Sequence, residues 1–110
     1  MPLPFCTYIL FSRRDHFLYI GYTSNIERRL KQHNAGETIS TRNRRPLELV
    51  FCEFYIFKSD AIKREDYFKT NAGKRTLKLM LRSTFDKMGY KGKPLSELQV
   101  QIESEDERED

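Results

Sequence analysis

Residues 5–34 read FCTYILFSRRDHFLYIGYTSNIERRLKQHN, and this segment has the strongest pattern of secondary structure in the chain. Its first part holds two short runs rich in aromatic and β-branched residues, at 5–12 and 17–22. The four residues between the runs are polar, a connection that is typical of a β-hairpin. The stretch therefore predicts two antiparallel strands, and side-chain alternation places Tyr8 and Tyr19 on one surface of the hairpin.

A helix is predicted directly after the hairpin, from about residue 25 to residue 34. Ser24 and Glu27 have the spacing of a capping box, and Gly36 is placed to end the helix. The remaining predicted elements are a polar loop at 37–46, a strand at 47–57, a helix capped by Ser59 or Asp60 that ends at about residue 71, a break at Gly73 and a helix at 74–85. This order favours an α/β domain with a small three-stranded, mainly antiparallel sheet flanked by helices.

The 110-residue chain has the length of one small domain, and its charge is unevenly distributed. Residues 1–102 hold nineteen basic and ten acidic side chains, a net charge of +9, whereas residues 103–110 hold six acidic side chains and one basic. Such a basic domain is typical of nucleic-acid-binding proteins. We expect a domain at 1–95 and an acidic, disordered tail at 96–110, which either keeps the chain soluble or competes with phosphate for the basic surface.

Membrane and disulfide-rich classes of protein are disfavoured. No apolar run approaches the roughly 20 residues that span a bilayer. The two cysteines, Cys6 and Cys52, are too few for a disulfide framework. We therefore expect a cytoplasmic protein with reduced thiols and no membrane partner.

Helix geometry separates two adjacent arginines. Ile26 and Leu30 are four residues apart and mark the apolar stripe of the first helix. At about 100° per residue, Arg28 points away from this stripe, whereas Arg29 and His33 lie at its edge. Only the second arginine is therefore expected to face the sheet.

Glu65 has an unusual position on the second predicted helix. It projects onto the apolar side of that helix, where a carboxylate is costly unless it is paired or binds a metal ion. A salt bridge to Arg29 is one explanation, and metal binding is the other.

Three segments together resemble a known family. Cys6-Thr7-Tyr8 stands on the first strand and Tyr19-Ile20-Gly21 on the second, and the latter runs into the arginine-containing helix. Together with residues 40–46 and 61–65, these segments resemble the GIY-YIG nuclease superfamily, in particular its small stand-alone members related to the excinuclease nuclease domain. The first triplet departs from Gly-Ile-Tyr but keeps the tyrosine. The resemblance covers roughly residues 5–83.

The resemblance implies a divalent-metal-dependent endonuclease that hydrolyses DNA phosphodiester bonds, with a place in DNA repair or recombination. It implies Tyr8 as general base, Tyr19 as the residue that positions water or supports the base, and Arg29 as the group that stabilises charge on the phosphate. His33 would donate to a phosphate oxygen or assist the base, or else be a structural helix cap. Glu65 would be the one protein ligand of a single Mg²⁺ or Mn²⁺ ion.

Other basic side chains are candidates for binding the DNA backbone, since such contacts go mostly to phosphates. The candidates are Arg28, Arg42, Arg44, Arg45, Lys74, Lys78 and Arg82. For any one of them, a solvated surface charge is the alternative. For the whole chain, the alternative function is a non-catalytic nucleic-acid-binding module on the same fold. DNA is the expected partner, and a protein partner could supply specificity.

Overall fold

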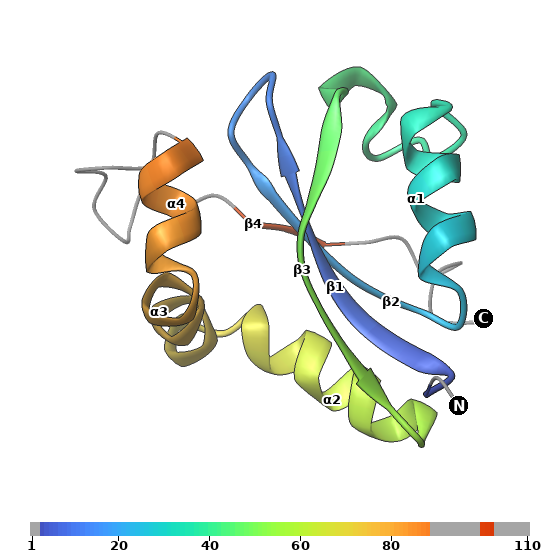
Figure 1. The fold of residues 1–110 in the computed structure, drawn as a ribbon, viewed down its shortest axis with the longest axis vertical. Coiled ribbons are helices and arrows are strands. Elements are labelled where there is room, and N and C mark those ends of the chain that lie inside the picture. The colour runs from blue at the N-terminus through green and yellow to red at the C-terminus, as the bar shows by residue number, and fades with distance from the viewer. Residues whose placement is uncertain (1–2, 89–99, 103–110) are drawn as a thin grey trace.

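The computed structural model describes residues 3–88 and 100–102 (Figure 1). Its sheet consists of β1 (Phe5–Ser12), β2 (Leu18–Thr23), β3 (Leu47–Tyr55) and β4 (Val100–Ile102), in the order β3-β1-β2-β4. β1 is antiparallel to both β2 and β3, which confirms the predicted three-stranded antiparallel sheet. β4 adds a short strand parallel to β2, which we did not predict.

β4 lies within the predicted acidic tail, 96–110. For residues 100–102 the prediction of disorder is wrong, since these residues pair with 18–20 of β2. The edge strand β2 offers backbone N–H and C=O groups, which can pair with any extended segment. Because the pairing uses backbone groups, the side chains of the sequence do not predict it. The rest of the tail lies outside the described residues, and the domain boundary at residue 95 stays a prediction.

Helices cover both faces of the sheet (Figure 1). α1 (Ile26–Asn34) lies on one face, and α2 (Lys58–Phe68), α3 (Asn71–Met80) and α4 (Arg82–Met88) lie on the other. No described helix is both long and apolar enough to cross a bilayer. The arrangement confirms the predicted α/β class.

Side-chain alternation along the strands builds two cores. On the α1 face the buried apolar side chains are Cys6, Tyr8, Leu10, Tyr19 and Leu47. On the other face, Ile9, Phe11, Leu18 and Ile20 of the sheet meet Phe68, Leu77, Leu81 and Phe85 of the helices. Tyr8 and Tyr19 therefore share one surface, as the hairpin pattern predicts.

α1 begins slightly later than the capping box predicts. Asn25 is its N-cap, with extended backbone (φ −153°) and a side-chain oxygen that accepts from the Arg28 N–H at 3.0 Å. The prediction of Ser24 as the cap is therefore wrong by one residue. Serine and asparagine are similarly good caps, so composition alone cannot choose between neighbours.

α2 and the helix after it also differ from prediction at their starts. The N-cap of α2 is Phe57, which makes no side-chain capping hydrogen bond, so neither Ser59 nor Asp60 caps it. The predicted helix at 74–85 is two helices, α3 and α4, which meet at Leu81.

Gly73 does not break a helix but lies inside α3, where it is buried. The break comes earlier, and Thr70 caps α3 by accepting from the Gly73 N–H at 3.0 Å. A Cβ on Gly73 would lie 1.8 Å from the carbonyl oxygen of Tyr67 and 2.7 Å from Cα of Phe68. Because both are backbone atoms, no side-chain rotation can relieve the overlap. Glycine therefore permits the close approach of α3 to the end of α2.

We expect Gly73→Ala to lower the free energy of unfolding by about 2–4 kcal/mol, because the two helices must move apart. Urea denaturation followed by circular dichroism measures this loss. The exposed neighbour provides a control, since Ala72→Gly should cost only about 1 kcal/mol through helix propensity. A Gly73→Ala protein as stable as the wild type would show that the helices do not need this close approach.

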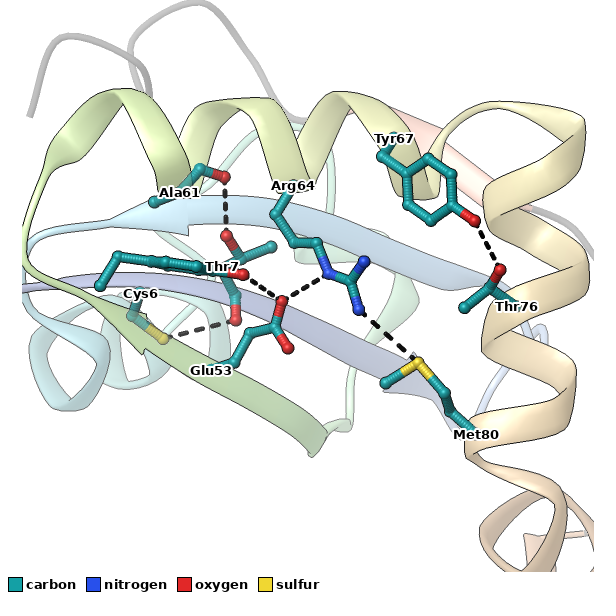
Figure 2. Close-up of polar contacts among 9 residues, drawn as sticks. Cys6, Thr7, Glu53, Ala61, Arg64, Tyr67, Thr76 and Met80 are labelled. Carbon is teal, nitrogen blue, oxygen red and sulfur yellow. Dashed lines mark hydrogen bonds and ion pairs between the residues drawn. The ribbon is translucent and has the colours of Figure 1, made fainter.

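An ion-paired arginine ties α2 to β3 and α3 (Figure 2). Arg64 Nε donates to Glu53 Oε1 at 2.6 Å, and Arg64 Nη2 lies 3.8 Å from Met80 Sδ. On β1, the Thr7 hydroxyl donates to the Ala61 carbonyl oxygen at 2.7 Å. These contacts fix the helix that carries the candidate metal ligand.

Candidate active site

The predicted general base, Tyr8, contacts His33 directly. Tyr8 Oη lies 3.2 Å from His33 Nε2, and both side chains are 0% exposed. They meet because Tyr8 faces α1 from the central strand and His33 is the buried residue of α1. The structure thus brings together two predicted site residues that are 25 positions apart.

Thr41 extends this contact to a third side chain. Its Oγ1 lies 2.7 Å from His33 Nδ1, and the side chain is fully buried. Thr41 stands directly before the short 3₁₀ turn η1 (Arg42–Arg44), in the loop between α1 and β3. We did not predict a role for Thr41, since a threonine in a polar, basic loop has no distinguishing sequence signal.

His33 is neutral at neutral pH. Burial, and secondly the positive charge of Arg29, lower the pKa of His33 from its ordinary value to about 4. A neutral imidazole has one protonated nitrogen and one lone pair, so it can donate to one neighbour and accept from the other. Both ring nitrogens of His33 contact side chains, Tyr8 and Thr41. A histidine that caps the helix would instead contact backbone groups at its end.

Tyr19 lies in the same buried cluster, with its hydroxyl directed to the hairpin turn. Tyr19 Oη donates to Asp15 Oδ2 at 3.4 Å, and the same carboxylate oxygen pairs with Arg44 at 3.1 Å. Asp15 also accepts from the Phe17 N–H at 2.8 Å, which fixes the carboxylate in the turn. Asp15 therefore links a predicted site tyrosine to the basic loop, a role that we did not predict.

The two adjacent arginines of α1 differ in burial in the predicted direction. Arg28 is exposed, whereas Arg29 is half-buried and donates from Nη1 to Gln32 Oε1 at 3.2 Å. Arg29 and His33 are four residues apart on α1, so they lie on the same side of the helix. The catalytic role of Arg29 itself stays a prediction.

Glu65 comes from the other side of the sheet. Its carboxylate is 0% exposed, which confirms that it faces the interior, but α2 packs on the face opposite α1 (Figure 1). Glu65 Oε2 accepts from Lys69 Nζ, one helical turn further on, at 3.1 Å. The predicted alternative, a salt bridge to Arg29, stays a prediction.

One carboxylate is a sparse but suitable donor set for a magnesium ion. In the described part of the chain, no group of three or more His, Cys, Asp or Glu side chains could enclose a metal ion. Mg²⁺ retains several waters and is often held by one carboxylate together with substrate phosphate, so Glu65 fits this type of site. The ion would replace the Lys69 ammonium at the carboxylate.

The seven predicted DNA-binding residues form two groups. Arg42, Arg44 and Arg45 lie in the loop that contacts α1, and Arg28 lies on α1 itself. The other group is on the opposite face of the sheet, where Lys74 and Lys78 lie on α3 and Arg82 begins α4 (Figure 1). These described residues therefore do not share one surface, and the helix break separates Arg82 from the two lysines.

Comparison with known proteins agrees with this arrangement. A family model described as the GIY-YIG catalytic domain matches residues 4–78, which include both tyrosines, α1 and Glu65. The chain belongs to the GIY-YIG family. GIY-YIG catalytic domains are nuclease domains that act on DNA and generally depend on a divalent metal ion.

Relatives of this GIY-YIG chain include small proteins named UPF0213 protein. The one from Staphylococcus haemolyticus is 43% identical over 68 residues, which cover 61% of this chain and 83% of the relative. The one from Natronomonas pharaonis is 48% identical over 64 residues, which cover 57% of this chain and 74% of the relative. No solved structure matches this chain.

Proposed function

We propose that this protein is an endonuclease that hydrolyses DNA phosphodiester bonds with a single Mg²⁺ or Mn²⁺ ion. The observation that carries the proposal is the buried hydrogen bond between Tyr8 and His33 inside a GIY-YIG catalytic domain. Arg29 lies one helical turn before His33 on α1, and His33 contacts Tyr8, so a cation, an imidazole and a phenol share one region.

Each residue of this region has a chemical part in the proposal. Tyr8 takes a proton from the attacking water, assisted by a hydrogen bond with His33. Tyr19, held by Asp15, orients the water. The planar donors of Arg29 stabilise charge on the phosphate oxygens. Glu65, which α2 brings from the opposite face of the sheet, would hold the divalent ion, and that ion would supply Lewis-acid chemistry for the hydrolysis.

Cleavage of a panel of DNAs tests the proposal. Supercoiled, nicked, linear and branched DNAs are incubated with Mg²⁺, with Mn²⁺ or with a chelator. We expect metal-dependent cleavage of at least one substrate by the wild type and none by Tyr8→Phe. Binding without cleavage across the panel would contradict the proposal and support the second candidate below.

A non-catalytic nucleic-acid-binding module is the second candidate. The observation that favours it is the state of Glu65, whose carboxylate is fully buried and ion-paired with Lys69. If this pair never opens, no metal ion can reach the carboxylate, and the basic surface would then act in binding alone.

DNA binding is expected to depend strongly on salt, because residues 1–102 carry a net charge of +9. With about four to seven phosphate contacts, affinity should fall about 10²-fold to 10⁴-fold between about 50 and 200 mM salt. Fluorescence anisotropy with labelled duplexes of unrelated sequence measures both the salt slope and its sequence independence. A flat response to salt would contradict electrostatic binding.

Paired variants decide which face holds the DNA. We expect Arg42→Ala with Arg45→Ala to reduce the salt slope by about 2, since each lost phosphate contact removes about 1. Lys78→Ala with Arg82→Ala is the matched control on the opposite face. The reverse result would place the DNA away from the two tyrosines and would contradict the proposed site.

The proposed function includes a cellular location and a role. We place the protein in the cytoplasm, acting in DNA repair or recombination, with specificity supplied by a protein partner. The state of the cysteines is consistent with a reducing compartment, since Cys6 and Cys52 are both free thiols. Burial is the main cause that raises the pKa of Cys6 to about 12, which keeps that thiol protonated.

A further inference from the structure

The Thr41 side chain is held in a defined place before it contacts His33. The Thr41 N–H donates to the Thr38 carbonyl oxygen at 3.2 Å, and the Arg44 N–H donates to the Thr41 carbonyl oxygen at 2.9 Å. These backbone bonds fix the turn from both sides. The hydroxyl therefore meets His33 Nδ1 from a rigid support, at 2.7 Å.

The burial of Thr41 determines the direction of this hydrogen bond. A hydroxyl has one hydrogen to donate, and a buried donor without an acceptor is costly. Within residues 3–88 and 100–102, the hydrogen bond to His33 is the one found for the Thr41 hydroxyl, whose side chain is fully buried. The hydroxyl therefore donates to Nδ1, because in the reverse direction its hydrogen would have no acceptor.

The state of the imidazole follows from this direction. If Nδ1 accepts, it carries no proton, and the single proton of a neutral imidazole must be on Nε2. Nε2 is the atom that lies 3.2 Å from Tyr8 Oη. The ring therefore donates to the tyrosine oxygen, and a donated hydrogen bond favours the phenolate over the phenol.

We propose that Thr41 is a positioning residue that holds His33 in its Nε2–H tautomer, so that His33 donates to Tyr8 and favours the phenolate that acts as base. The catalytic part of this inference rests on the proposed function, whereas the tautomer does not. The titratable and charged groups around the pair are Arg29 on α1, Tyr19 on β2, Cys52 opposite Tyr8 on β3, and Cys6 on β1.

Nitrogen-15 NMR of the histidine side chains tests the tautomer without DNA or metal. The chain has two histidines, and the exposed His16 is the internal reference for His33. At pH 7 we expect His33 to show a protonated Nε2 and an unprotonated Nδ1. Thr41→Ser should keep this pattern, and Thr41→Val, which has the same shape without a hydroxyl, should lose it.

The pH dependence of DNA cleavage tests the consequence for Tyr8. We expect Thr41→Val to lower kcat at pH 7 about 10-fold to 100-fold, as is typical when a supporting hydrogen bond is removed. The rising limb of the pH–rate profile should move about one unit to higher pH. Thr41→Ser should restore both quantities, and Thr41→Ala is a second hydroxyl-free variant should Thr41→Val fold poorly.

Two NMR results would overturn the tautomer assignment. One is a protonated Nδ1 on His33 in the wild-type protein, and the other is an unchanged tautomer in both hydroxyl-free variants. If the wild type cleaves no DNA, the proposed function fails while the NMR experiment still decides the tautomer. If cleavage occurs and Thr41→Val loses rate with an unmoved pH profile, Thr41 does not act through Tyr8.

Discussion

Glu65→Gln is expected to lose DNA cleavage by about 10³-fold or more while DNA binding stays within a few-fold of the wild type. The amide keeps the shape of the side chain but removes the charge that attracts a divalent ion, and loss of several kcal/mol of transition-state stabilisation corresponds to this factor. Single-turnover cleavage over a range of Mg²⁺ concentrations, together with anisotropy binding, measures both quantities.

The stability of Glu65→Gln should change by no more than about 1 kcal/mol. The amide oxygen can still accept from Lys69, whose side chain is 12% exposed and can extend its ammonium group to water. Urea denaturation checks this point. A large loss of stability, with activity falling only in proportion to the folded fraction, would show that Glu65 has a structural role alone.

Lys69→Met is the matched control, because it removes the other partner of the same ion pair. If Glu65 holds the metal ion, this variant loses a competitor for the carboxylate, so less Mg²⁺ should give half-maximal cleavage. If the ion pair itself is what matters, Lys69→Met should lose as much activity as Glu65→Gln. Equal losses would therefore contradict the metal assignment.

Arg29→Ala is expected to lower kcat about 10²-fold to 10³-fold, the effect typical of removing one donor to a developing negative charge. Arg28→Ala, at the exposed neighbouring position, should cost no more than a few-fold through weaker DNA binding. Arg29→Lys should recover little, since lysine lacks the planar fork that matches phosphate oxygens. Equal losses from the two alanine variants would contradict the assigned site.

Arg29→Ala also has a readout that is independent of cleavage. Burial is the main cause of the lowered pKa of His33 and the positive charge of Arg29 is the second, so removal of this charge should raise the pKa above about 4 while burial keeps it below its ordinary value. Arg28→Ala should leave it unchanged. NMR titration of His33 measures the shift, with the exposed His16 as reference.

The sequence predicted the hairpin, the three antiparallel strands and α1 closely, because their signals are local. Alternation along 5–12 and 17–22 indicates which side chains share a face, and the helix period separates Arg28 from Arg29. The ends of elements were predicted less closely, since α1 is capped by Asn25 and not by Ser24. Each cap depends on backbone angles at one residue, which composition does not determine.

The predicted helix break at Gly73 is wrong, because packing overrides the low helix propensity of glycine there. Gly73 has the sequence signal of a helix break, but it lies inside α3 because only a residue without Cβ fits against the backbone of Tyr67. The break at Leu81 divides the predicted helix at 74–85 and has no clear sequence signal.

Local sequence patterns predicted how each candidate side chain is oriented relative to its own strand or helix. Tyr8 and Tyr19 share a face, and Glu65 faces the interior, because periods of 2 and 3.6 residues are properties of the local backbone. Which side chains meet depends on tertiary packing. Contacts such as Tyr8 with His33, or His33 with Thr41, and the packing of α2 on the face opposite α1, depend on how elements distant in the chain stack on a shared sheet. No local pattern records that stacking, because it is selected by the fit of all the buried side chains together.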